Sequence, residues 1–182
     1  DGRGVLRKLV SRAGEPFVRQ AVGAAMRLMG QVFVMGRTID EAIKRMDASE
    51  NKGFTASFDM LGEAARTSAD AARYFEAYQG AIAAVGANPA RGHSVSVKLS
   101  ALHPRYEYTH RDRVIAELVP RALDLAKQAA KANIGFNIDA EEADRLDLSL
   151  DVIAAVLADE RLAGWDGFGI VVQAYGQRAS HV

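Results

Sequence analysis

The feature that most constrains this chain is a repeated order of strand and helix patterns after Gly53. Four short segments alternate apolar with polar side chains, as half-buried strands do. They cover residues 54–59, 94–99, 134–139 and 168–173. Between them, apolar residues recur at the spacing of three or four that is typical of helices. Strands that alternate with helices form a parallel sheet with right-handed crossovers. The order predicts an α/β fold, either a doubly wound sheet or an eightfold barrel.

The polarity of the predicted strands favours the barrel. One face of each strand is apolar, whereas the other carries residues such as Ser57, Ser96 and Asn137. A parallel sheet that is covered by helices on both sides should be apolar on both faces. A barrel interior that carries a site explains the polar face better. We therefore predict the first half of a (βα)8 barrel, with four parallel strands in the order one to four.

The last polar residue of each of these faces lies at the carboxyl end of its strand. These residues are Asp59, Lys98, Asp139 and Gln173. Barrel enzymes place catalytic residues at this end. Because neighbouring strands lie about 4.8 Å apart, we expect Lys98 between the two aspartates, where it stays charged and can hold a substrate carboxylate. For each residue, a structural ion-pair network is the alternative.

The residues before the first predicted strand indicate a helical arm, so we divide the chain into an arm, 1–53, and an incomplete barrel, 54–182. Pro16 fits the first turn of a helix, where its missing N–H costs nothing. Thr38 begins a capping-box pattern that marks a second helix start. Within the barrel segment, Pro120 is expected to break or kink its helix.

Composition excludes several classes of function. Lys plus Arg and Asp plus Glu each number 23, which argues against a nucleic-acid-binding surface over the whole domain. Without cysteine the chain has no disulfide, thiolate nucleophile or cysteine-ligated metal. The histidines lack a metal-ligand spacing, so no metal site is predicted, and they are expected in loops or at the surface. No apolar run is long enough to span a bilayer, and a cytoplasmic setting fits. The absence of an initial Met indicates an excerpt or a processed chain.

Two other signals are interpreted as structural. Glu141 and Glu142 follow Asp139 directly, and acidic residues are favoured in the first turn of a helix. Glycines between Gly164 and Gly169 precede the fourth strand, whereas a dinucleotide-binding loop follows a strand and opens a helix. We interpret these glycines as turn residues.

Four long strings stand in the order of the predicted strands, and a fifth precedes them. They are Phe58–Ala65, Ser96–Tyr106, Asn137–Leu146 and Val172–Tyr175, after Gly14–Gly30. These strings resemble the proline dehydrogenase domain of bacterial bifunctional proline-utilisation proteins, with the first string similar to the arm that leads into the barrel. The resemblance covers nearly the whole chain. It implies a distorted (βα)8 barrel with non-covalent FAD at the carboxyl ends of its strands.

The resemblance also assigns residues to the substrate. It makes Lys98 the lysine that binds the proline carboxylate, and Asp139 the catalytic aspartate near the substrate. Glu63 corresponds to the acidic half of an ion pair over the substrate, whose arginine partner is expected beyond Val182. Asp59 matches a polar residue of the substrate site.

For the cofactor, the resemblance places Asp139 and Ala140 beside the flavin and Gln173 in a hydrogen bond to its ring. The implied reaction is FAD-dependent oxidation of L-proline to pyrroline-5-carboxylate, the first step of proline catabolism to glutamate. The implied partners are the rest of the barrel, an NAD-dependent aldehyde dehydrogenase domain and a membrane quinone as electron acceptor. The parent protein is expected in the cytoplasm or peripheral to the inner membrane, and we expect no nucleic-acid contact through this segment.

Two alternatives stay open at this point. A barrel lyase could use Lys98 as a Schiff-base nucleophile, although such lysines need a lowered pKa and the flanking aspartates act in the opposite direction. The chain could also be a non-catalytic fragment, because only four strands are predicted and a flavin enzyme of this kind needs later ones.

Overall fold

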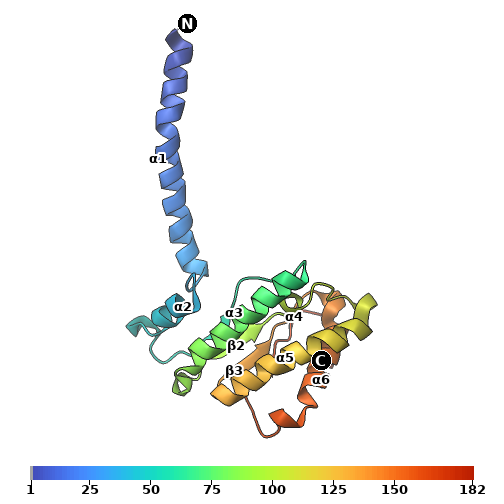
Figure 1. Ribbon diagram of the computed structural model, residues 1–182. Coiled ribbons are helices and arrows are strands. Elements are labelled where there is room, and N and C mark those ends of the chain that lie inside the picture. Colours follow the sequence, from blue (N-terminus) through green and yellow to red (C-terminus); the bar gives the residue numbers. More distant parts are fainter. Residues whose placement is uncertain (1) are drawn as a thin grey trace. The chain divides into compact units, whose positions relative to one another are not determined.

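The computed structural model describes residues 2–182, which form two compact units. One unit ends at Lys52, and the second runs from Gly53 to Val182. Figure 1 draws the first unit in blue and the second in colours from cyan to red. Among the described helices, none combines the length and the apolar character that a membrane crossing requires.

The first unit is helical. It contains α1 (Gly2–Phe33), α2 (Ile39–Met46) and the short 3-10 helix η1 (Ser49–Asn51). Pro16 lies inside α1 and not in its first turn, which corrects the sequence-based prediction. The helix starts well upstream, at Gly2, so proline costs it one backbone hydrogen bond in its interior.

Of the two hydrogen bonds that make up the predicted capping box, one is present at the start of α2. The Thr38 hydroxyl accepts a hydrogen bond from the Glu41 backbone N–H at 3.2 Å. The Glu41 carboxylate, however, accepts from the backbone N–H of Arg37 at 2.9 Å and not from that of Thr38. Thr38 therefore begins the helix as predicted, and one donor before it is satisfied by the side chain of Glu41.

The second unit is built on a four-stranded sheet in the order β1-β2-β3-β4, with every neighbouring pair parallel. The strands are β1 (Ser57–Asp59), β2 (Ser94–Val97), β3 (Gly135–Ile138) and β4 (Phe168–Ile170). Phe58, Val95, Phe136 and Phe168 are partners across the sheet. This confirms the predicted α/β class and strand order.

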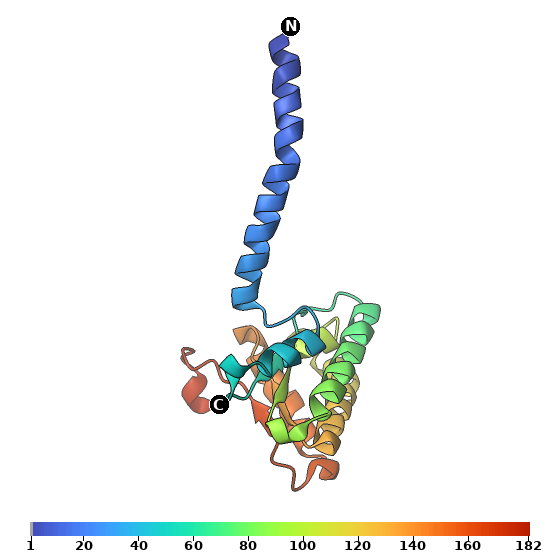
Figure 2. The ribbon, with the colours of Figure 1, turned by 90° about the vertical axis from the view of Figure 1, so that its left-hand side faces the viewer.

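Helices connect the strands and cover one face of the sheet. The α-helices are α3 (Ser68–Gly86), α4 (Leu99–Leu102), α5 (Arg111–Ala132) and α6 (Leu146–Leu157). The 3-10 helices are η2 (Pro89–Arg91), η3 (Tyr108–His110), η4 (Ala143–Arg145), η5 (Glu160–Leu162) and η6 (Ala179–His181). Helix α5 contacts both α3 and α6, and the three run along the same side of the sheet in Figures 1 and 2.

The two faces of the sheet differ as the sequence predicts. Val95 and Val97 of β2 and Phe136 of β3 are fully buried beneath the helices. On the other face, the Asn137 side-chain amide donates to the hydroxyls of Ser57 and Ser94, both at 3.1 Å. The hydrophobic core therefore lies between sheet and helices, and the opposite face carries hydrogen-bonded polar side chains.

Three local predictions differ from the structure. The observed strands are shorter than predicted, and Leu99 begins α4 and does not end β2. Helix α5 continues through Pro120, so the proline does not break it. Pro120 is exposed, so water can reach the carbonyl group that proline leaves without an intrahelical partner.

Candidate active site

The ammonium group of Lys98 lies between two carboxylates at the carboxyl ends of neighbouring strands. Its Nζ is 2.7 and 2.8 Å from the two oxygens of Asp59 and 2.7 Å from Oδ2 of Asp139. Asp59 ends β1, Lys98 follows β2 and Asp139 follows β3. Because these strands are parallel neighbours, their carboxyl ends meet at one edge of the sheet. The predicted position of Lys98 between the aspartates is therefore observed.

The environment of Lys98 keeps it charged. Its side chain is 13% exposed, against 23% for Asp139 and 46% for Asp59. Burial by itself lowers the pKa of Lys98, but hydrogen bonds and charges from Asp139 and Asp59 outweigh it and raise the pKa above its ordinary value. The amine is therefore an ammonium ion at physiological pH, able to bind an anionic group.

Hydrogen bonds hold the backbone of Lys98 and Asp139 in place. The buried hydroxyl of Tyr78 on α3 accepts a hydrogen bond from the backbone N–H of Lys98 at 3.1 Å. Burial raises the pKa of Tyr78 to about 12, so the phenol is neutral. The backbone N–H of Asp139 donates to Val97 at 2.9 Å, and Asp139 Oδ1 accepts from the N–H of Ala140 at 2.9 Å. The carboxylate of Asp139 is thus held by its own loop and by Lys98.

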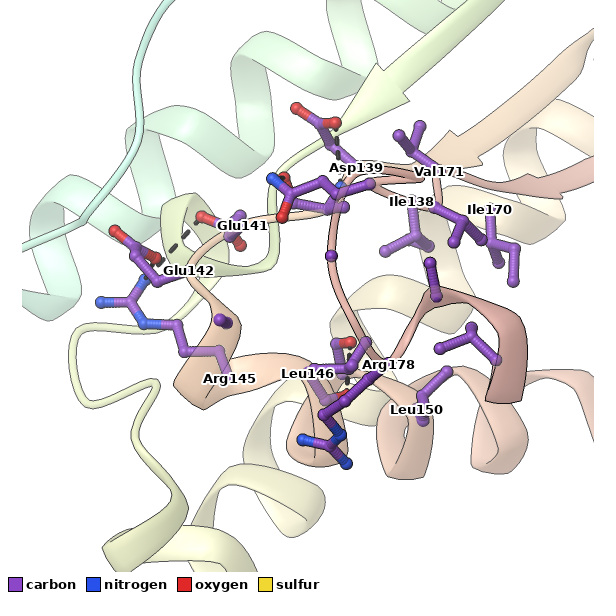
Figure 3. A pocket seen from close by; sticks show the side chains of 18 of the residues that line it. Ile138, Asp139, Glu141, Glu142, Arg145, Leu146, Leu150, Ile170, Val171 and Arg178 are labelled. Carbon is purple, nitrogen blue, oxygen red and sulfur yellow. Dashed lines mark hydrogen bonds and ion pairs between the residues drawn. The ribbon is translucent and has the colours of Figure 1, made fainter.

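A cavity of about 650 Å³ opens at this edge of the sheet. Lys98, Asp139 and Glu141 contribute polar groups, and residues after β4 and on α6 contribute apolar ones. Figure 3 shows Leu146 and Leu150 on the helix side of the cavity and Ile170 and Val171 on the strand side. The cavity therefore joins a charged end to an apolar wall, the combination typical of small-molecule sites.

The wall that follows β4 is apolar and open. Val171 and Val172 are 44% and 40% exposed, and Tyr175 is 87% exposed. Beside them, the side-chain amide of Gln173 donates to the backbone carbonyl of Ala140 at 3.3 Å. This surface offers apolar contact and an adjacent amide to a planar, partly polar group.

Comparison with known proteins identifies the family. The family profile of proline dehydrogenase matches residues 42–182, which is most of the chain. The chain belongs to the proline dehydrogenase family.

Relatives within the proline dehydrogenase family are much longer proteins. The bifunctional protein PutA of Klebsiella aerogenes is 50% identical over 182 residues, covering 97% of this chain and 14% of that protein. PutA of Rhizobium meliloti is 51% identical over 179 residues, covering 96% and 14%. A crystal structure of Proline Utilization A from Bradyrhizobium japonicum is 55% identical, with a TM-score of 0.76, covering 96% of this chain and 18% of that one. The chain therefore spans about one seventh of the curated relatives that it matches.

The structure brings together most residues that the resemblance to proline dehydrogenases assigned. Asp59 bonds Lys98, while Asp139, Ala140 and Gln173 line the same cavity. Glu63 also lines the cavity, from the segment after β1, with its residue exposed. The geometry is compatible with a shared site, and the role of each residue stays a prediction.

The sequence-based interpretation of Glu141 is wrong. Glu141 does not lie in the first turn of a helix, because η4 begins at Ala143 and α6 only at Leu146. Its side chain is 8% exposed, accepts the backbone N–H of Ser100 at 3.0 Å and bonds the Ser100 hydroxyl. Burial raises the pKa of Glu141, against the effect of these hydrogen bonds. The run of two glutamates gave no signal that distinguishes this buried carboxylate from a helix-start acid.

His103 lies in the loop that follows α4, as predicted for the histidines, but it is buried, with 1% of its surface exposed. Its Nδ1 accepts the backbone N–H of Arg105 at 3.1 Å, and its Nε2 lies 3.1 Å from the carboxylate of Glu117. Nε2 therefore carries a proton and donates to Glu117. The imidazole fixes the turn after α4, which leads to Tyr106 in the cavity wall.

Proposed function

We propose that this chain provides the substrate-binding half of a barrel that oxidises L-proline to pyrroline-5-carboxylate with FAD. Membership of the proline dehydrogenase family supports the reaction class. The observation that carries the proposal is the ammonium of Lys98, held between Asp59 and Asp139 at the edge of a cavity of about 650 Å³. A fixed cation beside a pocket suits a small amino acid with a free carboxylate.

The cavity wall fits a flavin. Exposed Val171 and Val172 offer apolar contact to an aromatic ring system, and the Gln173 amide is a hydrogen-bond donor next to Ala140. When bound, FAD supplies the redox chemistry by accepting a hydride. We propose that Gln173, Ala140 and Asp139 are the residues of this chain that contact it.

The protein side of the reaction is binding and orientation. Oxidation of proline to pyrroline-5-carboxylate transfers a hydride from the CH2 carbon next to the ring nitrogen to the oxidant and releases a proton from the nitrogen. We propose that Lys98 binds the carboxylate of proline, while Asp139 holds Lys98 in place and faces the substrate. Fixing one end of a small substrate positions its reacting carbon and lowers the entropic part of the barrier. Glu63 then covers the substrate from the segment after β1.

The direct test uses the full-length protein that carries this chain. Purified with its flavin under anaerobic conditions, it should lose the visible absorption of oxidised flavin when L-proline is added. An amino acid without the ring, such as L-alanine, serves as a control. A flavin that stays oxidised in the presence of saturating L-proline would contradict the proposed reaction.

Replacement of the lysine provides a prediction about binding. Lys98→Met keeps the aliphatic length but removes the ammonium, and it should raise KM for L-proline by about 10- to 100-fold, since a charge-assisted contact contributes roughly 1.5–3 kcal/mol. The matched control is Lys131→Met, which removes an exposed lysine at the end of α5. Steady-state kinetics of both variants measures the effect, and an unchanged KM in Lys98→Met would remove the lysine from the binding site.

The lyase alternative makes a different prediction. A Schiff-base lysine needs a neutral amine, whereas the hydrogen bonds that Lys98 donates to two aspartates raise its pKa. We therefore expect borohydride treatment in the presence of a carbonyl ligand such as pyruvate to leave Lys98 unmodified. Peptide mass spectrometry locates any adduct, and a reduced adduct on Lys98 would favour the lyase.

Further proposals concern the protein around this chain. The curated relatives are named bifunctional, so we propose that a second, NAD-dependent aldehyde dehydrogenase domain lies outside this segment and converts the product onward to glutamate. We also propose that electrons leave to a membrane quinone and that the protein works in the cytoplasm, peripheral to the inner membrane. Sedimentation with quinone-containing vesicles in the presence of L-proline tests the membrane association.

A further inference from the structure

The segment after β1 that carries Glu63 has an unusual backbone. Gly62 has φ of 140° and Ala64 has φ of 52°. A positive φ is disfavoured for alanine, because its Cβ crowds the backbone, so the conformation persists only where neighbouring contacts enforce it. The residues between Leu61 and Ala65 therefore need an external support.

That support comes from Ser100, which is 2% exposed and follows β2 in α4. Its hydroxyl oxygen accepts the backbone N–H of Ala64 at 3.0 Å, and its backbone carbonyl accepts the N–H of Ala65 at 2.9 Å. Ala65 itself is 6% exposed. Two consecutive backbone donors, directly after Glu63, thus bond to a single buried residue.

Ser100 is in turn fixed by Glu141, the buried carboxylate after β3. Glu141 accepts the backbone N–H of Ser100 at 3.0 Å and also bonds the Ser100 hydroxyl. A hydroxyl has one hydrogen and two lone pairs. When its hydrogen is committed to the carboxylate, only lone pairs remain for Ala64. Glu141 therefore sets the direction of the hydroxyl so that it accepts from the segment with Glu63.

We infer that Ser100 and Glu141 are positioning residues that hold the segment Leu61–Ala65 and so place Glu63 over the cavity. The inference rests on the proposed role of this cavity in binding proline. It links three strand ends: a residue after β3 orients a residue after β2, which holds the segment after β1. A polar chain of this kind gives the backbone of the exposed Glu63 a defined location.

The test is Ser100→Ala in the full-length, flavin-loaded enzyme. The variant keeps the backbone contacts of residue 100 but removes the acceptor of the Ala64 N–H. Hydrogen exchange of peptides covering residues 60–66 should become at least about fivefold faster, and KM for L-proline should rise about five- to tenfold with kcat within about twofold. The control is Ser94→Ala, which removes a hydroxyl bonded to Asn137 at the other end of β2 and should change neither value.

A second variant guards against failure of Ser100→Ala to fold. Glu141→Gln keeps the side-chain shape but offers one acceptor oxygen instead of two, so the same peptides should exchange faster and KM should rise by a smaller factor. Unchanged exchange over residues 60–66 in either soluble variant would overturn the inference. If L-proline does not reduce the flavin of the wild-type enzyme, the proposed function fails, whereas the exchange data still decide whether Ser100 and Glu141 hold the segment.

Discussion

Asp139→Ala is expected to slow flavin reduction by L-proline by about two orders of magnitude in the full-length enzyme. Asp139 Oδ2 lies 2.7 Å from Lys98 Nζ, and its Oδ1 accepts the N–H of Ala140. Alanine removes both contacts, so we expect Lys98 to bond Asp59 alone and the backbone N–H of Ala140 to lose its partner. A loss of about 2.7 kcal/mol of transition-state stabilisation corresponds to this factor.

The control for Asp139→Ala is an aspartate with comparable contacts away from the cavity. Asp159 accepts the backbone N–H of Arg161 at 3.0 Å and its guanidinium at 2.7 Å. Asp159→Ala should lower the free energy of unfolding, because it removes the side-chain cap of η5, and leave the rate unchanged. Anaerobic stopped-flow absorbance measures reduction, and thermal unfolding measures stability. Near-normal reduction in Asp139→Ala would remove Asp139 from the catalytic residues.

Much of the sheet could be predicted because its physics is local and periodic. Alternation of apolar and polar residues determines which side of each strand is buried, and the order of strands and helices implies parallel pairing. Together these place Asp59, Lys98 and Asp139 at one edge, where the structure finds them in contact. The cavity opens at the same edge, where the sequence predicted a site but no cavity.

Contacts that depend on the third dimension were not predictable in this way. Pro16 inside α1 and Pro120 inside α5 show that a longer helix can continue through proline. Glu141 has the residue type of a helix-start acid, but its burial against Ser100 depends on how two loops meet. His103 is buried for the same reason, through a partner fourteen positions away, Glu117. No periodicity in the sequence encodes such pairs.

The largest expected effect concerns residues 1–182 produced on their own. The sheet ends at β1 on one side and at β4 on the other, and strand edges without partners pair readily with other chains. Ile170, Val171 and Val172, at and after the end of β4, are 42%, 44% and 40% exposed. A face with so much accessible apolar surface favours association.

The strand ends at the cavity of this segment are only part of those that a full barrel provides. The carboxyl ends of β2, β3 and β4 carry the cation, Lys98, and the proposed flavin contacts, Ala140 and Gln173. A complete barrel surrounds its ligand with all of its strand ends, whereas this segment has only those of its four strands. We expect residues 1–182 alone to show no L-proline-dependent dye reduction and to form dimers or larger species. Light scattering and a dye-reduction assay on the same sample measure both, with the full-length protein as the positive control. A monodisperse monomer that binds flavin and oxidises L-proline would show that this half of the sheet is sufficient for the reaction.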